Sequence, residues 1–199
     1  MQNNYVLCDS KNIACIQLFA IVLAQCQFYN GIIAQKALLS LGQVWGFTLE
    51  KTLNAMHNLG YLYQTYADTF EEASSPSNFY ELAIEAYQGV IEKLGTHTLP
   101  DKQLLLATQI NYGSVHYKKR NFLAARVIQN QIIDTIEADE RLKNSPTHVA
   151  NIYNLALTEK ASNNCSKSQE LLEMALEMSK GIPEPDSSII RSLLVATKA

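Results

Sequence analysis

The chain has 199 residues, of which 47% are apolar and 18% are charged. This composition can bury a core and the length suits one domain, so we expect a single globular domain over residues 1–199. The net charge of −3 at pH 7 provides no basic surface, which argues against a nucleic-acid partner. The longest apolar run, Ile13–Ala24, is shorter than the roughly 20 residues of a membrane span and contains Gln17, so no membrane span is expected.

Four cysteines, Cys8, Cys15, Cys26 and Cys165, show neither a CxxC pair nor a spacing to histidines that suits zinc. A disulfide framework is not indicated either, and we expect reduced, buried thiols. This favours a cytoplasmic location, in a reducing compartment. A removed targeting segment leaves an organelle lumen open as an alternative.

The first helix pair is expected over about residues 10–46. Asp9 and Ser10 are good N-cap residues for a helix that runs to about residue 30, where Gly31 is expected to end it. A second helix is expected over about residues 32–44. Gly42 and Gly46 can take the left-handed conformation at the end of this helix. Trp45 and Phe47 are expected to cover the core between this pair and the next.

The second pair is expected over about residues 48–95. Helical spacing continues from Thr48 to Ala73, and Ser74–Asn78 (SSPSN) is the strongest loop signal in the chain. Pro76 suits the first turn of the following helix, which we expect to end at Leu94.

The third pair is expected over about residues 100–140, beginning at Asp101. Residues 109–133 (QINYGSVHYKKRNFLAARVIQNQII) place apolar residues at intervals of three and four on both sides of the polar segment KKRN. That segment predicts a turn between two short amphipathic helices.

The fourth pair is expected over about residues 146–181. Ser145–Pro146 is an N-cap residue followed by a proline suited to the first helical position, and residues 162–164 predict the turn. A last helix, over about residues 187–197, would cover the end of the stack.

A small residue recurs at the same place in these pairs. Tyr112–Gly113 is followed twelve residues after the glycine by Ala125, and Leu155–Ala156 is followed in the same way by Ser168. Two helices about 8–10 Å apart touch backbone to backbone only where a side chain is missing, so these positions predict close contacts. The small residues of the four pairs stand at 24, 60, 113 and 156, separated by 36, 53 and 43 residues.

This pattern resembles the tetratricopeptide repeat (TPR), and the interval of 43 resembles the longer variety of kinesin light chains and bacterial peptide receptors. The resemblance implies an all-α fold, a right-handed superhelical solenoid of antiparallel helix pairs with a C-terminal capping helix. It also implies protein or peptide binding on the concave face, because repeat stacks usually function in this way.

No nucleophile motif, phosphate loop or paired-carboxylate signature is present in the sequence. We therefore expect no enzyme, no catalytic residue, no cofactor and no metal site. His116 lies three residues after Gly113 and is expected to pack in the core, whereas His57 is expected on the side of its helix that faces away from the core.

Asparagine stands two residues before the small residue in three pairs, as Asn58, Asn111 and Asn154. In the TPR solenoid this position faces the concave surface, and the resemblance implies that these amides hold the backbone of an extended peptide. The alternative is a solvated polar position repeated by duplication. The full set of residues expected to bind a peptide is Asn54, His57, Asn58, Tyr61, Gln64, Asn111, Ser114, Tyr117, Asn154 and Lys160.

The expected role is a non-catalytic adaptor or scaffold whose partner is a protein or an extended peptide segment. The sites where chaperone-binding TPR proteins carry basic residues hold Asn54, Ala107 and Ala150, so a carboxylate clamp is not expected. Two alternatives stay open. The chain could be a structural subunit of a larger complex, or a peptide-sensing regulatory module without its DNA-binding part.

Overall fold

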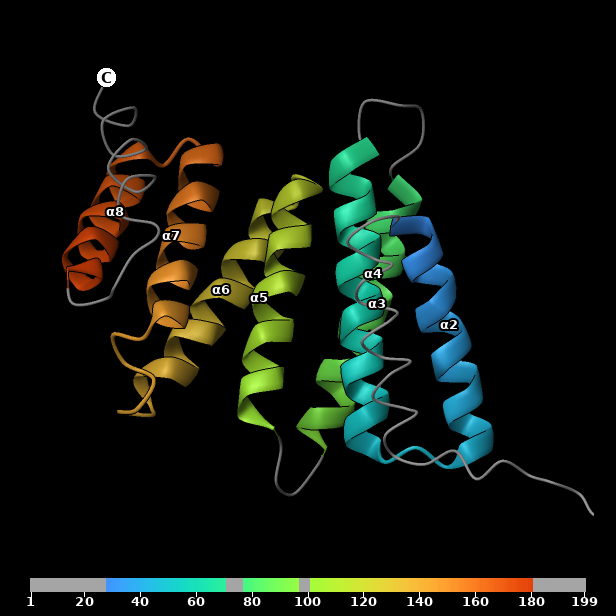
Figure 1. Cartoon of the computed structure of the whole chain (residues 1–199). Helices are drawn as coiled ribbons and strands as arrows, with labels where there is room; N and C mark the ends of the chain where they lie inside the picture. Colours follow the sequence, from blue (N-terminus) through green and yellow to red (C-terminus); the bar gives the residue numbers. More distant parts are fainter. Residues whose placement is uncertain (1–27, 71–76, 97–100, 181–199) are drawn as a thin grey trace, which may run out of the picture. The chain divides into compact units, whose positions relative to one another are not determined.

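The computed structural model describes residues 28–70, 77–96 and 101–180. Their regular secondary structure is entirely helical, in elements labelled α2 to α8 (Figure 1). Most of the first expected helix, residues 74–76 of the expected loop, and the whole expected capping helix lie outside the described residues. The described helices form two compact units, α2–α4 and α5–α8.

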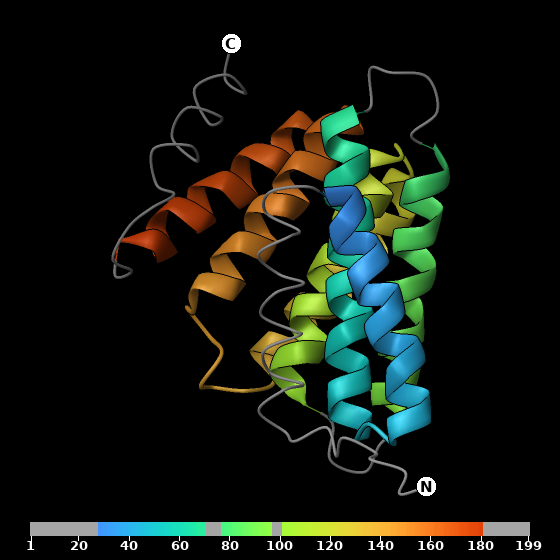
Figure 2. The same cartoon turned by 45° about the vertical axis from the view of Figure 1, so that its right-hand side comes forward.

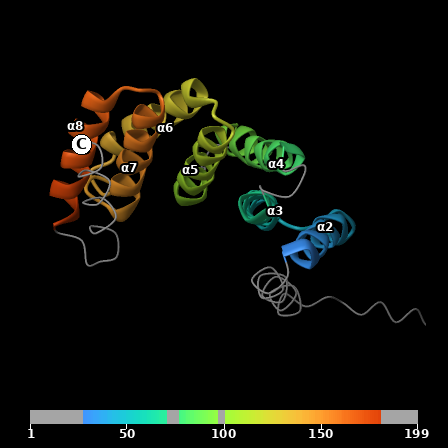
Figure 3. The same cartoon turned by 90° about the horizontal axis from the view of Figure 1, so that it is seen from above.

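The first unit contains α2 (Phe28–Trp45), α3 (Leu49–Phe70) and α4 (Ser77–Gly95). Helix α3 packs against both α2 and α4, as the view along the helices shows (Figure 3). The apolar residues of each helix recur at intervals of three and four, which places them on the packed faces. Buried apolar residues of this unit include Ile32, Leu38, Leu53, Leu59, Leu62, Tyr63, Ala67, Tyr80, Ala83, Tyr87, Val90 and Leu94.

Gly31 does not end a helix, because α2 runs through it without a break. The buried residues of α2 are Gly31, Ile32, Gln35, Leu38 and Gly42, which follow the helical period, and α2 packs on α3. Burial of this stripe outweighs the cost of about 1 kcal/mol for a glycine inside a helix. The expectation of a helix boundary at Gly31 was therefore wrong.

The end of α2 is a Schellman motif. Gly46 has a φ of +66°, and the N–H of Phe47 donates to the carbonyl of Gly42 at 2.9 Å. A Cβ at Gly42 would lie 2.5 Å from Cδ2 of Phe47, so the aromatic ring needs a glycine there. Trp45 is exposed, which contradicts the expectation that it covers the core.

The second unit contains α5 (Lys102–Lys118), α6 (Phe122–Glu137), α7 (Pro146–Ala161) and α8 (Cys165–Ser179). Each helix packs on the next one along the chain, and α5 also contacts α7 (Figure 2). The buried apolar residues of this unit include Leu104, Leu106, Val115, Ala125, Ile132, Ile136, Val149, Ile152, Leu155, Ala156, Leu171, Leu172 and Ala175.

The helix starts in this unit are the ones that the sequence predicts. The carboxylate of Asp101 accepts from the N–H groups of Gln103 and Leu104, both at 3.0 Å, and caps α5. The hydroxyl of Ser145 accepts from the N–H of His148 at 3.2 Å, with Pro146 in the first helical position of α7.

The turns from α5 to α6 and from α7 to α8 have the same geometry, 43 residues apart. Arg120 and Asn163 have φ values of 59° and 62°. The next residue donates its N–H to the carbonyl five residues back, at 2.9 Å from Asn121 to His116 and at 2.8 Å from Asn164 to Glu159. The repeat of 43 residues is therefore a structural repeat.

The small residues mark close contacts, but the contacts join a backbone to a side chain. A Cβ at Gly60 would lie 2.7 Å from Cε1 of Tyr87. A Cβ at Gly113 would lie 3.4 Å from Cγ2 of Ile128. The expectation that two helix backbones touch at Gly113 was therefore wrong, although the glycine does face the partner helix.

Candidate functional site

Asn58, Asn111 and Asn154 occupy equivalent places on α3, α5 and α7, and all three are half-buried. Their side-chain amides make no hydrogen bond to another residue in the described part of the chain. Two of the three, Asn111 and Asn154, lie in one unit on helices that contact each other. The donors and the acceptor of each amide are therefore available for further hydrogen bonds.

The residues around the two amides of the second unit are small, polar or aromatic. An exposed alanine precedes each asparagine by about one helical turn, at Ala107 and Ala150. The side chains of Ser114, Tyr117 and Lys160 are half-buried, and the ring of Tyr117 lies 5.8 Å from that of Phe122.

In the first unit, two of the residues that were expected to bind a peptide pack against α4 instead. The ring of His57 lies 5.8 Å from the ring of the fully buried Tyr87, and Oε1 of Gln64 accepts from the hydroxyl of Tyr87 at 3.1 Å. The expectation that His57 faces away from the core was therefore wrong. Burial also lowers the pKa of the His57 imidazole, which keeps it neutral near pH 7.

The other expected residues of α3 lie toward solvent. Tyr61 is 54% exposed, and Asn54 is half-buried with its amide donating to the carbonyl of Glu50 at 3.0 Å. On α3, the open positions are therefore those of Asn58 and Tyr61.

Neither α5 nor α7 presents an unpaired carboxylate. Helix α5 contains no aspartate or glutamate, and Glu159 is the one acidic residue of α7. The Glu159 side chain is 7% exposed, and Arg126 of α6 binds it with Nε at 2.6 Å from Oε1 and Nη2 at 3.0 Å from Oε2. The two amides therefore stand on helices whose exposed charges are all basic.

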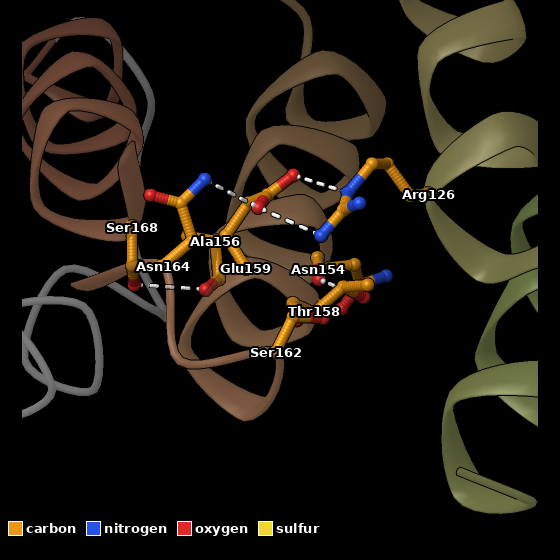
Figure 4. Close-up of polar contacts among 8 residues, drawn as sticks. All are labelled: Arg126, Asn154, Ala156, Thr158, Glu159, Ser162, Asn164 and Ser168. Atoms are coloured by element: carbon orange, nitrogen blue, oxygen red, sulfur yellow. Dashed lines mark hydrogen bonds and ion pairs between the residues drawn. The ribbon is translucent and has the colours of Figure 1, made fainter. Parts of the chain in front are cut away.

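This Glu159 network was not foreseen from the sequence. Asn164, in the turn into α8, donates its side-chain amide to Oε2 of Glu159 at 3.0 Å (Figure 4). The partners are 33 and 5 residues from Glu159, so no short-range pattern joins Arg126 to it. Glu159, the one acidic residue of α7, was the available signal.

Two other residues that were considered in the sequence, His116 and Cys165, lie outside this site. The ring of His116 lies edge-on against that of Tyr112 on the same helix, with ring centroids 4.7 Å apart. Cys165 is exposed at the start of α8, so the expectation of a buried thiol was wrong for this cysteine.

Within residues 28–70, 77–96 and 101–180, no three histidine, cysteine or acidic side chains gather in a way that could hold a metal ion. None of the helices in these ranges combines the length and the apolar character that crossing a membrane requires.

Comparison with solved structures shows that the fold is TPR-like. A crystal structure of a Podosopora anserina protein described as a kinesin light chain with nearly identical TPR-like repeats superimposes with a TM-score of 0.72 at 16% identity. A single-residue variant of that protein gives 0.73, also at 16% identity. Both matches cover 93% of this chain and 84% of the other. No family model matches the sequence, and no curated protein sequence matches it.

Proposed function

We propose that this protein is a non-catalytic adaptor that binds an extended peptide segment of another protein along α5 and α7. A TPR-like fold is in general a scaffold for protein interactions, which supports a protein partner. The observation that carries the proposal is the pair of half-buried amides, Asn111 and Asn154, at one register and without a partner among the described residues.

The chemistry of these amides suits a peptide backbone. An extended chain presents N–H and C=O groups along its length, and a side-chain amide can accept from one and donate to the other. Half-burial shields such hydrogen bonds from water and still leaves the amides accessible. The net charge of −3 supports a protein partner over a nucleic acid.

The test is a binding measurement on a peptide selected with the wild-type protein from a random displayed library. Asn111→Ala should weaken binding by about 1–3 kcal/mol, or roughly ten- to a hundredfold, because the peptide groups that it pairs lose their partner. The melting temperature should stay close to the wild-type value, since alanine is the better helix former by up to ~0.7 kcal/mol.

The matched control is Asn130→Ala, because Asn130 is an exposed asparagine on α6. This variant should bind the selected peptide like wild type. Two results would contradict the proposal: an Asn111→Ala variant with wild-type affinity, or one that is clearly less stable, which would make the amide structural.

A second candidate function, a fixed subunit of a larger assembly, is favoured by one feature of the first unit. Helix α2 carries a row of exposed apolar side chains, with Ile33 51%, Leu41 36%, Val44 79% and Trp45 43% exposed. Such a patch is commonly covered in an assembly. A monodisperse monomer that selects peptides would support the adaptor, whereas self-association that Val44→Gln relieves would support the subunit.

A further inference from the structure

We propose that Glu159 is a positioning residue, which with Arg126 and Asn164 fixes the orientation of α7 and so sets the spacing between the amides of Asn111 and Asn154. This inference rests on the proposed function. It starts from the geometry in Figure 4, where the Glu159 carboxylate accepts hydrogen bonds from Arg126 of α6 and from Asn164 in the turn into α8.

The form of the Arg126–Glu159 contact fixes an angle as well as a distance. Both oxygens of the carboxylate receive a separate N–H of the guanidinium, so the two planar groups must stay aligned. Arg126 stands on α6, which packs on α5 as well as on α7. The contact therefore locks α7 to the helix that also holds α5.

The preceding helix pair shows that a TPR-like pair folds without this network. The residue 43 positions before Glu159 is His116, whose ring lies edge-on against that of Tyr112. The residue 43 positions before Asn164 is Asn121, whose side chain caps α6 by accepting from the N–H of Ala124 at 3.4 Å.

Asn164 does not cap α8 in the way that Asn121 caps α6. No side-chain hydrogen bond caps α8, although Asn164 occupies its N-cap position, and its amide is directed to Glu159 instead. A lost cap lowers the stability of a helix, and a partly buried ion pair gives little or no net stability. The network is therefore poorly explained as a stabilising device, and a fixed orientation of α7 explains it better.

The experiment replaces both charged groups by apolar ones of similar length, in the double variant Arg126→Met with Glu159→Met. The melting temperature should stay near the wild-type value, because removing both partners leaves no unpaired charge. The affinity for the peptide selected on wild type should fall about three- to thirtyfold, the range for residues that act without touching the ligand. Glu159→Gln, which keeps the shape and loses the charge, should weaken binding in the same direction.

The control is Glu170→Gln, which breaks the exposed pair of Lys167 and Glu170 within α8 and should leave the affinity unchanged. A double variant with wild-type affinity would overturn the positioning role. A double variant whose affinity and melting temperature fall together would assign the network to stability, and would overturn it as well. If Asn111→Ala weakens binding and the double variant does not, the positioning role alone fails, whereas wild-type binding by Asn111→Ala refutes the proposed function itself.

Discussion

Gly60 and Gly113 stand at the same place in successive first helices, but they face different neighbours. At Gly60 the neighbour is the ring of Tyr87, which is fully buried and whose hydroxyl donates a hydrogen bond to Gln64. At Gly113 the nearest atom is the Cγ2 methyl group of Ile128, at ordinary van der Waals distance. The glycine is therefore required at the first site and replaceable at the second.

We expect Gly60→Ala to destabilise the first unit by about 1–3 kcal/mol, because the added methyl would force the Tyr87 ring out of its place. Gly113→Ala should be neutral or stabilising, since a contact at 3.4 Å needs little adjustment and alanine gains up to ~1 kcal/mol of helix propensity. Urea unfolding of the two variants measures both effects. Equal effects of the two substitutions would show that the Tyr87 contact does not distinguish the sites.

Arg120 is an arginine in a backbone conformation that favours glycine. Its φ of 59° costs about 1–2 kcal/mol for a residue with a side chain, and the next turn has Asn163 in the same place. We expect Arg120→Gly to raise the free energy of unfolding by about 1 kcal/mol, as measured by urea unfolding.

The control for this substitution is the neighbouring residue. Lys119 has a φ of −72°, where glycine brings no relief and costs about 0.5–1 kcal/mol through its greater freedom in the unfolded chain. Lys119→Gly should therefore destabilise. If both glycine variants destabilise the protein, Arg120 is held by interactions that outweigh its strain.

At the scale of elements, the connection from α6 to α7 is fastened by His148. Its Nδ1 accepts from the N–H of Asn144 at 3.3 Å, which places the proton of the neutral ring on Nε2. The side chain is buried at the start of α7. Burial lowers the pKa of His148, and the nearby charge of Glu137 opposes this only in part.

This predicts a pH dependence of stability. A histidine whose pKa is lower in the folded chain than its ordinary value of 6.5 binds more protons in the unfolded chain. Its contribution is complete above that value and is lost as the pH falls through and below it. The melting temperature should therefore fall from about pH 7.5 to about pH 5.

His148→Gln should reduce this slope, because glutamine can accept the same hydrogen bond and does not titrate. Part of the slope should remain, since the pKa of His57 is lowered in the same direction. The carboxyl of Asp139 affects stability in a separate, more acidic pH range. Hydrogen bonds from Arg141 hold the pKa of its carboxyl below the usual 3.8, so its contribution is lost only at more acidic pH. An unchanged slope in His148→Gln would exclude His148 as a source.

The element boundaries that the sequence could predict are those with a local cause. Asp101 and Ser145 cap helices through bonds to residues two or three positions away, so the signal lies within one turn. Gly31 was misread because the decisive interaction is the packing of α2 on α3, which depends on residues far along the chain. Local preference gave way to tertiary burial there.

At the scale of the whole molecule, the repeat register could be predicted and the distant contacts could not. The spacing of Asn111 and Asn154 from Gly113 and Ala156 places both amides at one phase, and the structure leaves both half-buried. The ring contact of His57 depends on Tyr87, 30 residues away in a different helix. The Arg126–Glu159 pair likewise joins helices whose relative orientation no local pattern specifies.

The identical turns at Arg120–Asn121 and Asn163–Asn164 make this part of the chain modular. Because both turns enter the next helix at the same register, a second copy of residues 122–164 could be spliced after Asn164 without disturbing either junction. The spliced chain would gain a second copy of α6 and a second copy of α7. The copy of α7 would add another amide like that of Asn154. The proposed binding surface could thus be extended in steps of 43 residues, each step adding one asparagine amide.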